Sequence, residues 1–495
     1  MILETITIIV YTTALIFILI YALAQLNLLF NYVRAKNKKA TPKKINWKNL
    51  DEVPFVTIQL PVYNEKYVME RLLKNIVLID YPKERLEIQV LDDSTDDTLE
   101  KTAALITELQ KTGIDIQHTL REKRTGFKAG ALKEGLKSAK GEFIAIFDAD
   151  FLPKPDWLKR TVPHFVSDNI GVVQTRWGHI NRDYSILTKV QAFALDAHFS
   201  LEQVGRNSHN HFINFNGTAG IWRKQCIIDA GNWEGDTLTE DLDLSYRAQL
   251  KGWKFAYLED VETPAELPVV ISAARSQQFR WNKGGAENFQ KMKWKLLTSP
   301  TIPLKTKIHG ILHLLNSTMF LNIFIVAVLS IPMLYIKNEY AHLKVYFIVM
   351  SFFVISTLIF FVCYWYMFKK IYGGGFLNFF KYIGMFFTFF SIAMGFSLHN
   401  TIAILEGHFG KKSEFIRTPK FNINTLKDSW KGNVYLKDKV SPHVIIEGLL
   451  MLYFAFGMYS AFVVGTEGDF GLFPFHLMLF LGFGYVFFKS LKVRS

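Results

Sequence analysis

The sequence predicts an α/β domain inserted between membrane-spanning helices. Short β-rich runs alternate with helical patterns from residue 54 to residue 260, which is typical of an α/β domain with a largely parallel sheet. Long apolar runs precede this region and follow it beyond Thr301. Lys and Arg gather beside the apolar runs, as they do on the cytoplasmic side of membrane helices.

The composition indicates a membrane protein. Half of the 495 residues are hydrophobic, Phe alone accounts for 44, and the formal net charge is +13. Such a charge could indicate nucleic acid, but basic residues concentrated beside apolar runs explain it without a nucleic-acid partner. Cys226 and Cys363 lie far apart, so the pattern supports neither a disulfide framework nor a Cys-based metal site.

The N-terminal segment, residues 1–33, is predicted to be a retained transmembrane anchor. Residues 2–33 contain one charged residue, Glu4, and are long enough to cross a bilayer. A secretory signal would begin with basic residues and end at a small-residue cleavage site, and neither is clear here. Seven Lys or Arg and no acid occur from Arg34 to Lys48, which puts the N-terminus outside and residues 34–264 in the cytoplasm.

The predicted strands of residues 34–264 end at polar side chains. Strands are expected at Phe55–Leu60, Leu86–Leu91 and Phe143–Phe147, with a helix from about Tyr67 to Ile79. Ligands of such sheets bind at the carboxyl ends of the strands, so acids that follow two different strands should converge on one crevice. These acids are Asp92, Asp93, Asp148 and Asp150.

The C-terminal half is predicted to contain four further crossings, at residues 308–336, 345–368, 443–464 and 470–488. A single crossing at 376–405 would put the basic residues 406–440, with eight Lys or Arg against four acids, outside. We therefore expect 376–405 to lie in the interface or to re-enter, leaving five crossings in the chain. The remaining boundaries are 265–304 for interfacial helices, 305–405 for membrane helices, 406–440 for a cytosolic loop, 441–488 for two crossings and 489–495 for a cytosolic tail with Lys489, Lys492 and Arg494.

Asp148 and Asp150 form a candidate site for Mg2+ or Mn2+. Two carboxylates with this spacing can hold a hard divalent cation and leave room for phosphate oxygens. A lone pair of this kind is weak evidence, because solvated turns are rich in Asp. Here the pair follows an apolar strand, and Asp92 and Asp93 follow another. A metal together with a diphosphate would indicate a nucleotide-linked donor.

Two predicted helix starts carry further candidate groups. Lys128 opens a helix where free amides and a cation would favour a diphosphate. The alternative interpretation is a solvated Lys on an ordinary helix. Thr239 is a natural cap with Glu240 and Asp241 in the following turn, and capping alone would account for them. If the fold brings Asp241 to the Asp148 crevice, it becomes a candidate base for an attacking hydroxyl.

The stretch Gln277–Lys283 lies where the α/β region meets the apolar half. It contains Arg280 and Trp281 side by side, which offer one group to a phosphate and one flat face to a ring. A membrane-surface helix with ordinary Arg and Trp anchors is the alternative interpretation.

In this order the motifs resemble the inverting, membrane-embedded synthases of glycosyltransferase family 2, which include cellulose synthases and plant mannan and glucomannan synthases. The likeness runs through nearly the whole α/β half, and its middle blocks are most similar to the mannan synthase and related β-glucan synthase branch. It implies a GT-A type, Rossmann-like domain. The matching blocks are Val90–Asp97, Lys128–Gly135, Asp148–Asp150, Phe215–Gly220, Thr239–Asp241, Lys251–Tyr257 and Gln277–Trp281.

The resemblance implies a donor site in the acidic crevice. Asp93 would contact the nucleotide base or ribose, and Asp148 with Asp150 would hold the metal on the donor diphosphate. The donor-binding residues would be Asp92, Asp93, Lys128, Asp148 and Glu240.

The resemblance also implies a catalytic and an acceptor side. Asp241 would be the general base, and one base suffices for a single displacement that turns an α-linked donor into a β-linked product. Gln277 and Arg280 belong to the Q-x-x-R-W signature, with Arg280 on the diphosphate and Trp281 stacked on the terminal acceptor sugar. The other acceptor residues would be Phe215, Asn216, Gly217 and Thr218.

Residues 415–420 resemble the F-x-V-T-x-K gating loop of cellulose synthases, with Phe415, Thr418 and Lys420 at the matching positions. Arg417 stands where that pattern has Val, which leaves the gating detail open. A gating loop must face the cytoplasm, in agreement with the topology expected from charge. Because seven residues follow Phe488, we expect no C-terminal regulatory domain of the cyclic-dinucleotide-binding kind.

The sequence thus predicts an integral membrane hexosyltransferase, in the plasma or inner membrane if bacterial, with its catalytic domain in the cytoplasm. It would extend a β-1,4-mannan or glucan from GDP-mannose or UDP-glucose and thread the product through its own helices. The alternative is a family 2 enzyme that adds one sugar to a membrane lipid. An inactive scaffold or transporter is disfavoured, because every ionisable group that the chemistry needs is present. An export partner and the oligomeric state cannot be inferred from these residues.

Overall fold

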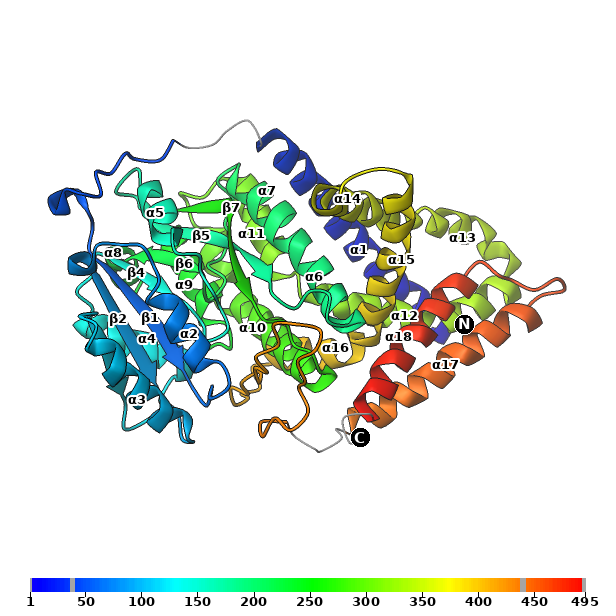
Figure 1. Ribbon diagram of the computed structural model, residues 1–495. Coiled ribbons are helices and arrows are strands. Elements are labelled where there is room, and N and C mark those ends of the chain that lie inside the picture. The colour runs from blue at the N-terminus through cyan, green and yellow to red at the C-terminus, as the bar shows by residue number, and fades with distance from the viewer. Residues whose placement is uncertain (1, 36–40, 437–441, 492–495) are drawn as a thin grey trace.

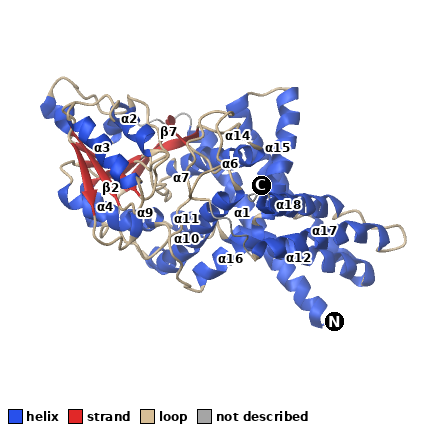
Figure 2. Ribbon diagram, turned by 60° about the horizontal axis from the view of Figure 1, so that its bottom comes forward, coloured by secondary structure: helices blue, strands red, loops and turns tan. Residues whose placement is uncertain are grey.

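The computed structural model describes residues 2–35, 41–436 and 442–491. Lys492 and Arg494 of the predicted tail and residues 36–40 of the basic segment lie outside the described residues. An α/β part and a helical part lie side by side, with α10 (Ile271–Thr298) between them (Figure 1). The strands gather in the first part alone (Figure 2).

The sheet of the described residues has seven strands in the order β3-β2-β1-β4-β6-β5-β7. The strands from β3 to β4 are parallel, β6 is antiparallel to both of its neighbours, and β5 is parallel to β7. The predicted largely parallel sheet is confirmed, with one reversed strand. The strands are β1 (Val56–Val62), β2 (Leu86–Asp92), β3 (Ile116–Leu120), β4 (Phe143–Ile146), β5 (Ile170–His179), β6 (Gly220–Arg223) and β7 (Lys254–Ala265).

The central strands are covered on both faces, which explains their apolar sequences. In β4, Phe143 and Ala145 join one hydrophobic core, whereas Ile144 and Ile146 join the other. Helices cover the two faces, so the carboxyl ends of the strands remain available for a site. The first face carries α2 (Met69–Ile76), α3 (Thr98–Gln110) and α5 (Trp157–Thr161), and the second α4 (Phe127–Ser138), α8 (Lys224–Asp229) and α9 (Glu240–Leu250).

The strand predictions agree with the structure to within two residues, but the first helix is shorter than predicted. Residues 67 and 68 belong to a turn in which the Glu65 carbonyl accepts hydrogen bonds from Val68 and Met69. The helix therefore begins at Met69 and ends at Ile76, not at Tyr67 and Ile79.

Among the described residues, six helical segments are long and apolar enough to cross a membrane. Five coincide with predicted crossings. The predicted crossing starts too early at residue 308, because this residue belongs to a separate helix, α11 (Leu304–Leu314), which a turn follows. Helix α11 packs on the α/β part, where the Tyr246 hydroxyl donates a hydrogen bond to the Gly310 carbonyl at 3.0 Å. The segments are Ile2–Ala35, Thr318–Glu339, Ala341–Tyr372, Phe376–Gly395, His443–Val463 and Phe473–Leu491.

The remaining helices form the membrane part and its links to the sheet. Two short ones, α6 and α7, link the sheet to the membrane part, where α7 lies against α1. These elements are α1 (Ile2–Ala35), α6 (Ile186–Ala197), α7 (Gln203–Asn207), α12 (Thr318–Glu339), α13 (Lys344–Ser351), α14 (Val354–Tyr372), α17 (His443–Val463) and α18 (Phe473–Leu491).

The segment predicted at 376–405 forms two helices, α15 (Phe376–Gly395) and α16 (Ser397–His408). Helix α15 is long and apolar enough to cross a membrane, in addition to the five segments that coincide with predicted crossings. Helix α16 packs along α10. Before α15, the Tyr372 hydroxyl accepts a hydrogen bond from Arg182 at 3.2 Å. In α16, Glu406 pairs with Lys283 of α10 at 3.1 Å. Residues just before and just after the segment 376–405 therefore contact the α/β part and α10.

Candidate active site

A cleft lies at the carboxyl ends of β1 and β4, bounded by α9, α10 and residues 415–420. Its cavity measures about 190 Å3. Elements far apart in the sequence contribute to its walls, and three of the four acids predicted to converge, Asp93, Asp148 and Asp150, line it, whereas Asp92 does not. The lining residues that the sequence had singled out are Asp93, Lys128, Asp148, Asp150, Asn216, Gly217, Glu240, Asp241, Gln277, Arg280, Trp281, Phe415, Thr418 and Lys420.

Asp148 and Asp150, which follow β4, each face a lysine. Lys128 donates to Asp148 and to the Gly217 carbonyl, the latter at 2.8 Å, and Lys420 donates to Asp150 Oδ2 at 2.8 Å. The other Asp150 oxygen, Oδ1, is buried and has no hydrogen-bond partner within the described residues. Two carboxylates with one unsatisfied buried oxygen form a donor set that fits a hard divalent cation.

Lys128 keeps its charge in spite of its burial. Burial lowers the pKa of this ammonium group, but Asp148 and then Glu240 outweigh it, and the net pKa is raised. A charged ammonium group therefore lies beside the carboxylates at neutral pH.

Glu240 and Asp241 begin α9, and both face the cleft. Burial raises the pKa of Asp241 to about 7, neighbouring Glu240 adds to the shift, and Lys128 opposes it. A Cβ added at Gly217, where φ is +77°, would lie 3.2 Å from Asp241 Oδ2. Glycine at position 217 thus lets the backbone approach the Asp241 carboxylate closely. The raised pKa of Asp241 suits a base that works near neutrality.

Gln277, Arg280 and Trp281 of α10 line the opposite wall. Arg280 donates to the Ile416 carbonyl, and its guanidinium lies 4.8 Å from the ring centroid of Phe415. Burial lowers the pKa of Arg280 to about 10, against the attraction of Glu240 and Asp148. The guanidinium is still protonated at neutral pH, so the cleft contains a cation from α10.

Residues 415–420 cross the mouth of the cleft. Arg417 pairs with Glu65 at 2.6 Å, and its guanidinium lies 4.4 Å from the ring centroid of Tyr435. The Phe415 ring stacks on Phe127 at a centroid distance of 5.7 Å. Burial raises the pKa of Glu65 to about 7, with Arg417 opposing. Arg417, which departs from the family pattern, thus forms an ion pair with the buried carboxylate of Glu65.

Three of the predicted site residues lie behind the cleft wall. Asp92 is 3% exposed, and its carboxylate accepts from the Ser94 N–H at 2.8 Å and pairs with His118 at 3.1 Å. Phe215 is part of a hydrophobic core. The Thr218 hydroxyl accepts a hydrogen bond from the Asp148 N–H at 2.9 Å. These residues support the wall instead of lining it.

The predicted capping role of Thr239 is wrong. Its side chain makes no capping hydrogen bond to α9, and its hydroxyl accepts instead from Asn288 of α10 at 3.0 Å. A Cβ at Gly284 would lie 2.4 Å from the Thr239 hydroxyl, so the two helices pack closely here. Thr239 joins the helix of Asp241 to the helix of Arg280.

The sequence analysis assigned no role to four charged residues of the cleft, Glu65, Arg124, Glu266 and Arg417. Glu65 comes shortly after β1, just as Asp93 follows β2 and Asp148 follows β4. The rule that ligands bind at the carboxyl ends of strands could therefore have identified it. The Arg124 guanidinium lies 3.4 Å from the ring centroid of Tyr63, and no local pattern signals that contact.

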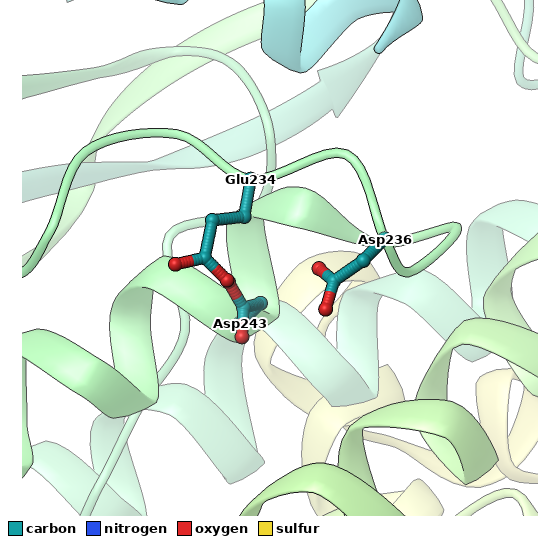
Figure 3. Close-up of side chains that lie close together, drawn as sticks. All are labelled: Glu234, Asp236 and Asp243. Carbon is teal, nitrogen blue, oxygen red and sulfur yellow. The ribbon is translucent and has the colours of Figure 1, made fainter.

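A second group of acids, Glu234, Asp236 and Asp243, lies outside the cleft lining (Figure 3). One carboxylate oxygen of each lies within 4.8 Å of the others. Lys291 of α10, however, reaches all three, at 2.7 Å from Glu234 and 2.8 Å from Asp236 and from Asp243. An ammonium group therefore occupies the position that a metal ion would need.

Residues 54–284 match the protein family described as Glycosyltransferase like family 2. We refer to residues 54–284 as the family 2 domain. The resemblance inferred from the order of the motifs is confirmed for this part of the chain.

Relatives of the family 2 domain include proteins named glucomannan 4-beta-mannosyltransferase. The chain is 43% identical over 263 residues to glucomannan 4-beta-mannosyltransferase 1 of Oryza sativa subsp. japonica. It is also 43% identical over 265 residues to glucomannan 4-beta-mannosyltransferase 2 of Arabidopsis thaliana. Each match covers 52% of this chain and 50% or 49% of the relative, so the chain spans about half the length of these relatives.

The fold is similar to that of a mannosyltransferase from Pyrobaculum calidifontis, solved in complex with GDP-Man and Mn2+. The TM-score is 0.53 at 20% identity, and the match covers 81% of this chain and 100% of the other. The expected GT-A type architecture is confirmed by this match.

Proposed function

We propose that the protein is an inverting hexosyltransferase that extends a β-linked mannan or glucan from a nucleotide sugar. The observation that carries the proposal is the meeting of Asp241, Asp148, Asp150 and Arg280 in one cleft of a family 2 domain. The glucomannan mannosyltransferase relatives favour a β-mannan product and GDP-mannose over UDP-glucose.

Asp241 is the proposed general base. Its pKa of about 7 leaves a large fraction deprotonated at neutral pH, while its basicity exceeds that of an ordinary carboxylate. Asp241 takes the proton of the acceptor hydroxyl as the oxygen attacks the donor sugar carbon from the face opposite the diphosphate. One displacement inverts the configuration, so an α-linked donor yields a β-linkage.

Arg280 and Lys128 are the proposed partners of the departing diphosphate, because preorganised positive charge stabilises the negative charge that develops there. Asp148 and Asp150 would hold Mg2+ or Mn2+, which supplies a Lewis acid to the same oxygens. Asp93 lines the donor side, where Arg121 Nε donates to it at 2.9 Å. We assign the nucleoside to this side.

The segment across the mouth has to move before a donor can bind. A cavity of about 190 Å3 is smaller than the roughly 300–1,000 Å3 of ordinary ligand pockets. Lys420 occupies one oxygen of Asp150, and Arg280 is bonded to Ile416. Donor binding would free both side chains for the diphosphate, in keeping with the gating role proposed for Phe415, Thr418 and Lys420.

Trp281 is the proposed acceptor platform, since a flat apolar ring face suits a pyranose. Asn216 and Gly217 line the same cleft. Tyr372, which precedes α15, and Glu406 of α16 contact the family 2 domain, which supports the proposal that α15 and α16 stay at one membrane surface. With five crossings the catalytic domain is cytoplasmic, and the product leaves through the membrane part.

The proposal is tested with the purified chain in lipid nanodiscs, supplied with radiolabelled GDP-mannose or UDP-glucose, with Mn2+, Mg2+ or EDTA. We expect β-linked product from GDP-mannose, loss of synthesis in EDTA, and a higher Mn2+ requirement for Asp150→Asn. Linkage analysis that finds only α-linked sugar would overturn the inverting assignment.

Product sizing separates processive synthesis from transfer of one sugar to a lipid. A ladder of long, β-mannanase-sensitive chains supports the polysaccharide synthase. A labelled product that extracts into organic solvent and carries one sugar supports the lipid-glycosylating alternative.

A further inference from the structure

A π-helical turn, His198–Glu202, joins α6 to α7 beside the first apolar helix, α1. Such a turn holds one residue more than an α-helical turn, and π-helical turns occur frequently at functional sites. The extra residue changes the direction in which the following side chains point. Gln203 directly follows the turn; it is completely buried and does not itself line the active-site cleft.

Helix α1 holds this turn from the membrane side. Gln25 Nε2 of α1 donates a hydrogen bond to the Glu202 carboxylate at 2.8 Å. In α7, a Cβ added at Gly205 would lie 2.6 Å from the Leu28 carbonyl oxygen of α1, so the two helix backbones are in close contact. Contacts on both sides of Gln203 therefore fix its position.

The Gln203 side chain fixes the orientation of the Asn216 amide. Gln203 Nε2 donates to Asn216 Oδ1 at 2.9 Å, and Asn214 Nδ2 donates to the same oxygen at 2.8 Å. Nearby backbone carbonyl oxygens, which can only accept, identify both donors. The Asn214 carbonyl lies 3.4 Å from Gln203 Nε2, and the Phe215 carbonyl lies 3.3 Å from Asn214 Nδ2. Asn216 Oδ1 is therefore engaged, and Nδ2 is the end of the amide that remains.

Asn216 Nδ2 is a buried donor that has no hydrogen-bond partner among the described residues. Asn216 is 8% exposed and lines the active-site cleft. It directly precedes Gly217, where an added Cβ would lie 3.2 Å from Asp241 Oδ2. A buried donor without a partner is costly, so an oxygen of a ligand in the cleft that accepts from Nδ2 would restore a lost hydrogen bond.

We propose that Gln203 is a positioning residue for acceptor binding. It holds the Asn216 amide so that Nδ2 donates a hydrogen bond to a hydroxyl oxygen of the acceptor sugar. This role rests on the proposed function and concerns its acceptor side. The position of Asn216 next to Gly217, which approaches the proposed base Asp241, favours the acceptor over the donor diphosphate.

The test measures binding of mannotetraose to the full-length chain in lipid nanodiscs by isothermal titration calorimetry, with GDP and Mn2+ in a separate titration. Gln203→Met removes the donated hydrogen bond and keeps a long side chain, so mannotetraose should bind about fivefold more weakly. GDP should bind as it does to the parent, because Gln203 does not line the cleft. An equal loss of GDP affinity would overturn the proposal.

Gln191→Met is the matched control. Gln191 belongs to α6, and its amide donates to the Pro268 carbonyl at 2.9 Å without lining the cleft. The substitution removes the same chemical group from the same run of helix, and both titrations should match those of the parent. Weakening of mannotetraose binding by Gln191→Met as large as that by Gln203→Met would contradict a specific role of Gln203.

A double-mutant cycle distinguishes positioning from a direct contact. If Gln203 acts through Asn216, Asn216→Ala should weaken mannotetraose binding, and adding Gln203→Met should weaken it no further. Additive effects would overturn the proposal. Asn214→Ala removes the other donor to Asn216 Oδ1 and should also weaken mannotetraose binding, which provides a test even if Gln203→Met does not fold.

The same preparations separate this role from the proposed function. A parent that binds mannotetraose but forms no β-linked product from GDP-mannose would contradict the transferase proposal alone. Unchanged mannotetraose affinity in Gln203→Met, with product still formed by the parent, would contradict the positioning role alone. A parent that binds neither mannotetraose nor cellotetraose would also overturn the positioning role.

Discussion

Two groups of carboxylates lie in the family 2 domain, and their surroundings differ. In the cleft, Asp150 Oδ1 is buried and has no hydrogen-bond partner within the described residues, and burial raises the pKa of Asp241. Outside the cleft, the group of Glu234, Asp236 and Asp243 is bridged by Lys291. The first group keeps a carboxylate oxygen available to a ligand, whereas each carboxylate of the second group is paired with Lys291.

The comparison shows that closeness of acids does not by itself make a functional site. The second group satisfies a distance criterion for a metal site, yet an ammonium group fills its centre and Arg247 adds a second cation to Asp243 at 2.6 Å. In the cleft the cations come partly from residues 415–420, which are far from the carboxylates in sequence. Availability of the carboxylates therefore distinguishes the two groups.

The largest expected effect is that of Asp241→Asn. Loss of the general base should lower kcat by about 1,000-fold, with circular dichroism and gel filtration unchanged. Asp236→Asn is the matched control from the second group, since it makes the same change at a carboxylate outside the cleft, and it should retain the parent rate. Full activity of Asp241→Asn would end its assignment as the base.

The pH profile tests the raised pKa of Asp241. Below a pKa of about 7 the carboxylate is protonated and cannot accept the acceptor proton, so kcat/KM should fall about tenfold per pH unit under that value. Glu65 also has a pKa raised to about 7, so Glu65→Gln is the control. A profile that loses its acid limb in Glu65→Gln would assign the titration to Glu65.

Lys291→Met tests the group of acids that Lys291 bridges. Three carboxylates lose their shared partner, and Asp243 is buried, so stability should fall by about 2 kcal/mol, seen as a lower Tm. Lys74→Met, which removes an exposed pair with Glu70, should leave Tm almost unchanged. The dependence of activity on Mn2+ concentration should be the same in Lys291→Met and the parent, and a new Mn2+ requirement would contradict the comparison.

Gly217→Ala should give the smallest change, about a tenfold loss of kcat. The added Cβ would lie 3.2 Å from Asp241 Oδ2, at a φ of +77°. Gly252→Ala is matched for backbone conformation, with a φ of +91° and nothing within 4 Å. Both variants should lose similar stability in thermal unfolding, and only Gly217→Ala should lose activity. Equal activities would mean that the contact with Asp241 is unimportant.

Local patterns predicted much of the fold and of the cleft. Strand ends were recognisable because an apolar run such as Phe143–Phe147 stops at acids, and parallel strands bring such acids to one edge. Lys128 and Asp241 were recognisable as the starts of helices. Thr239 was assigned wrongly because the contact that decides its role comes from Asn288, 49 residues away in sequence.

The sequence by itself determined the alternation of strands and helices, the apolar segments and the order of the family motifs, because these depend on local periodicity and composition. Only the tertiary structure decided which charges remain available. The pairing of Lys291 with three acids, of Arg417 with Glu65 and of Lys420 with Asp150 joins residues distant in sequence. Charge interactions depend on distance and burial in space, and neither can be inferred from spacing along the chain.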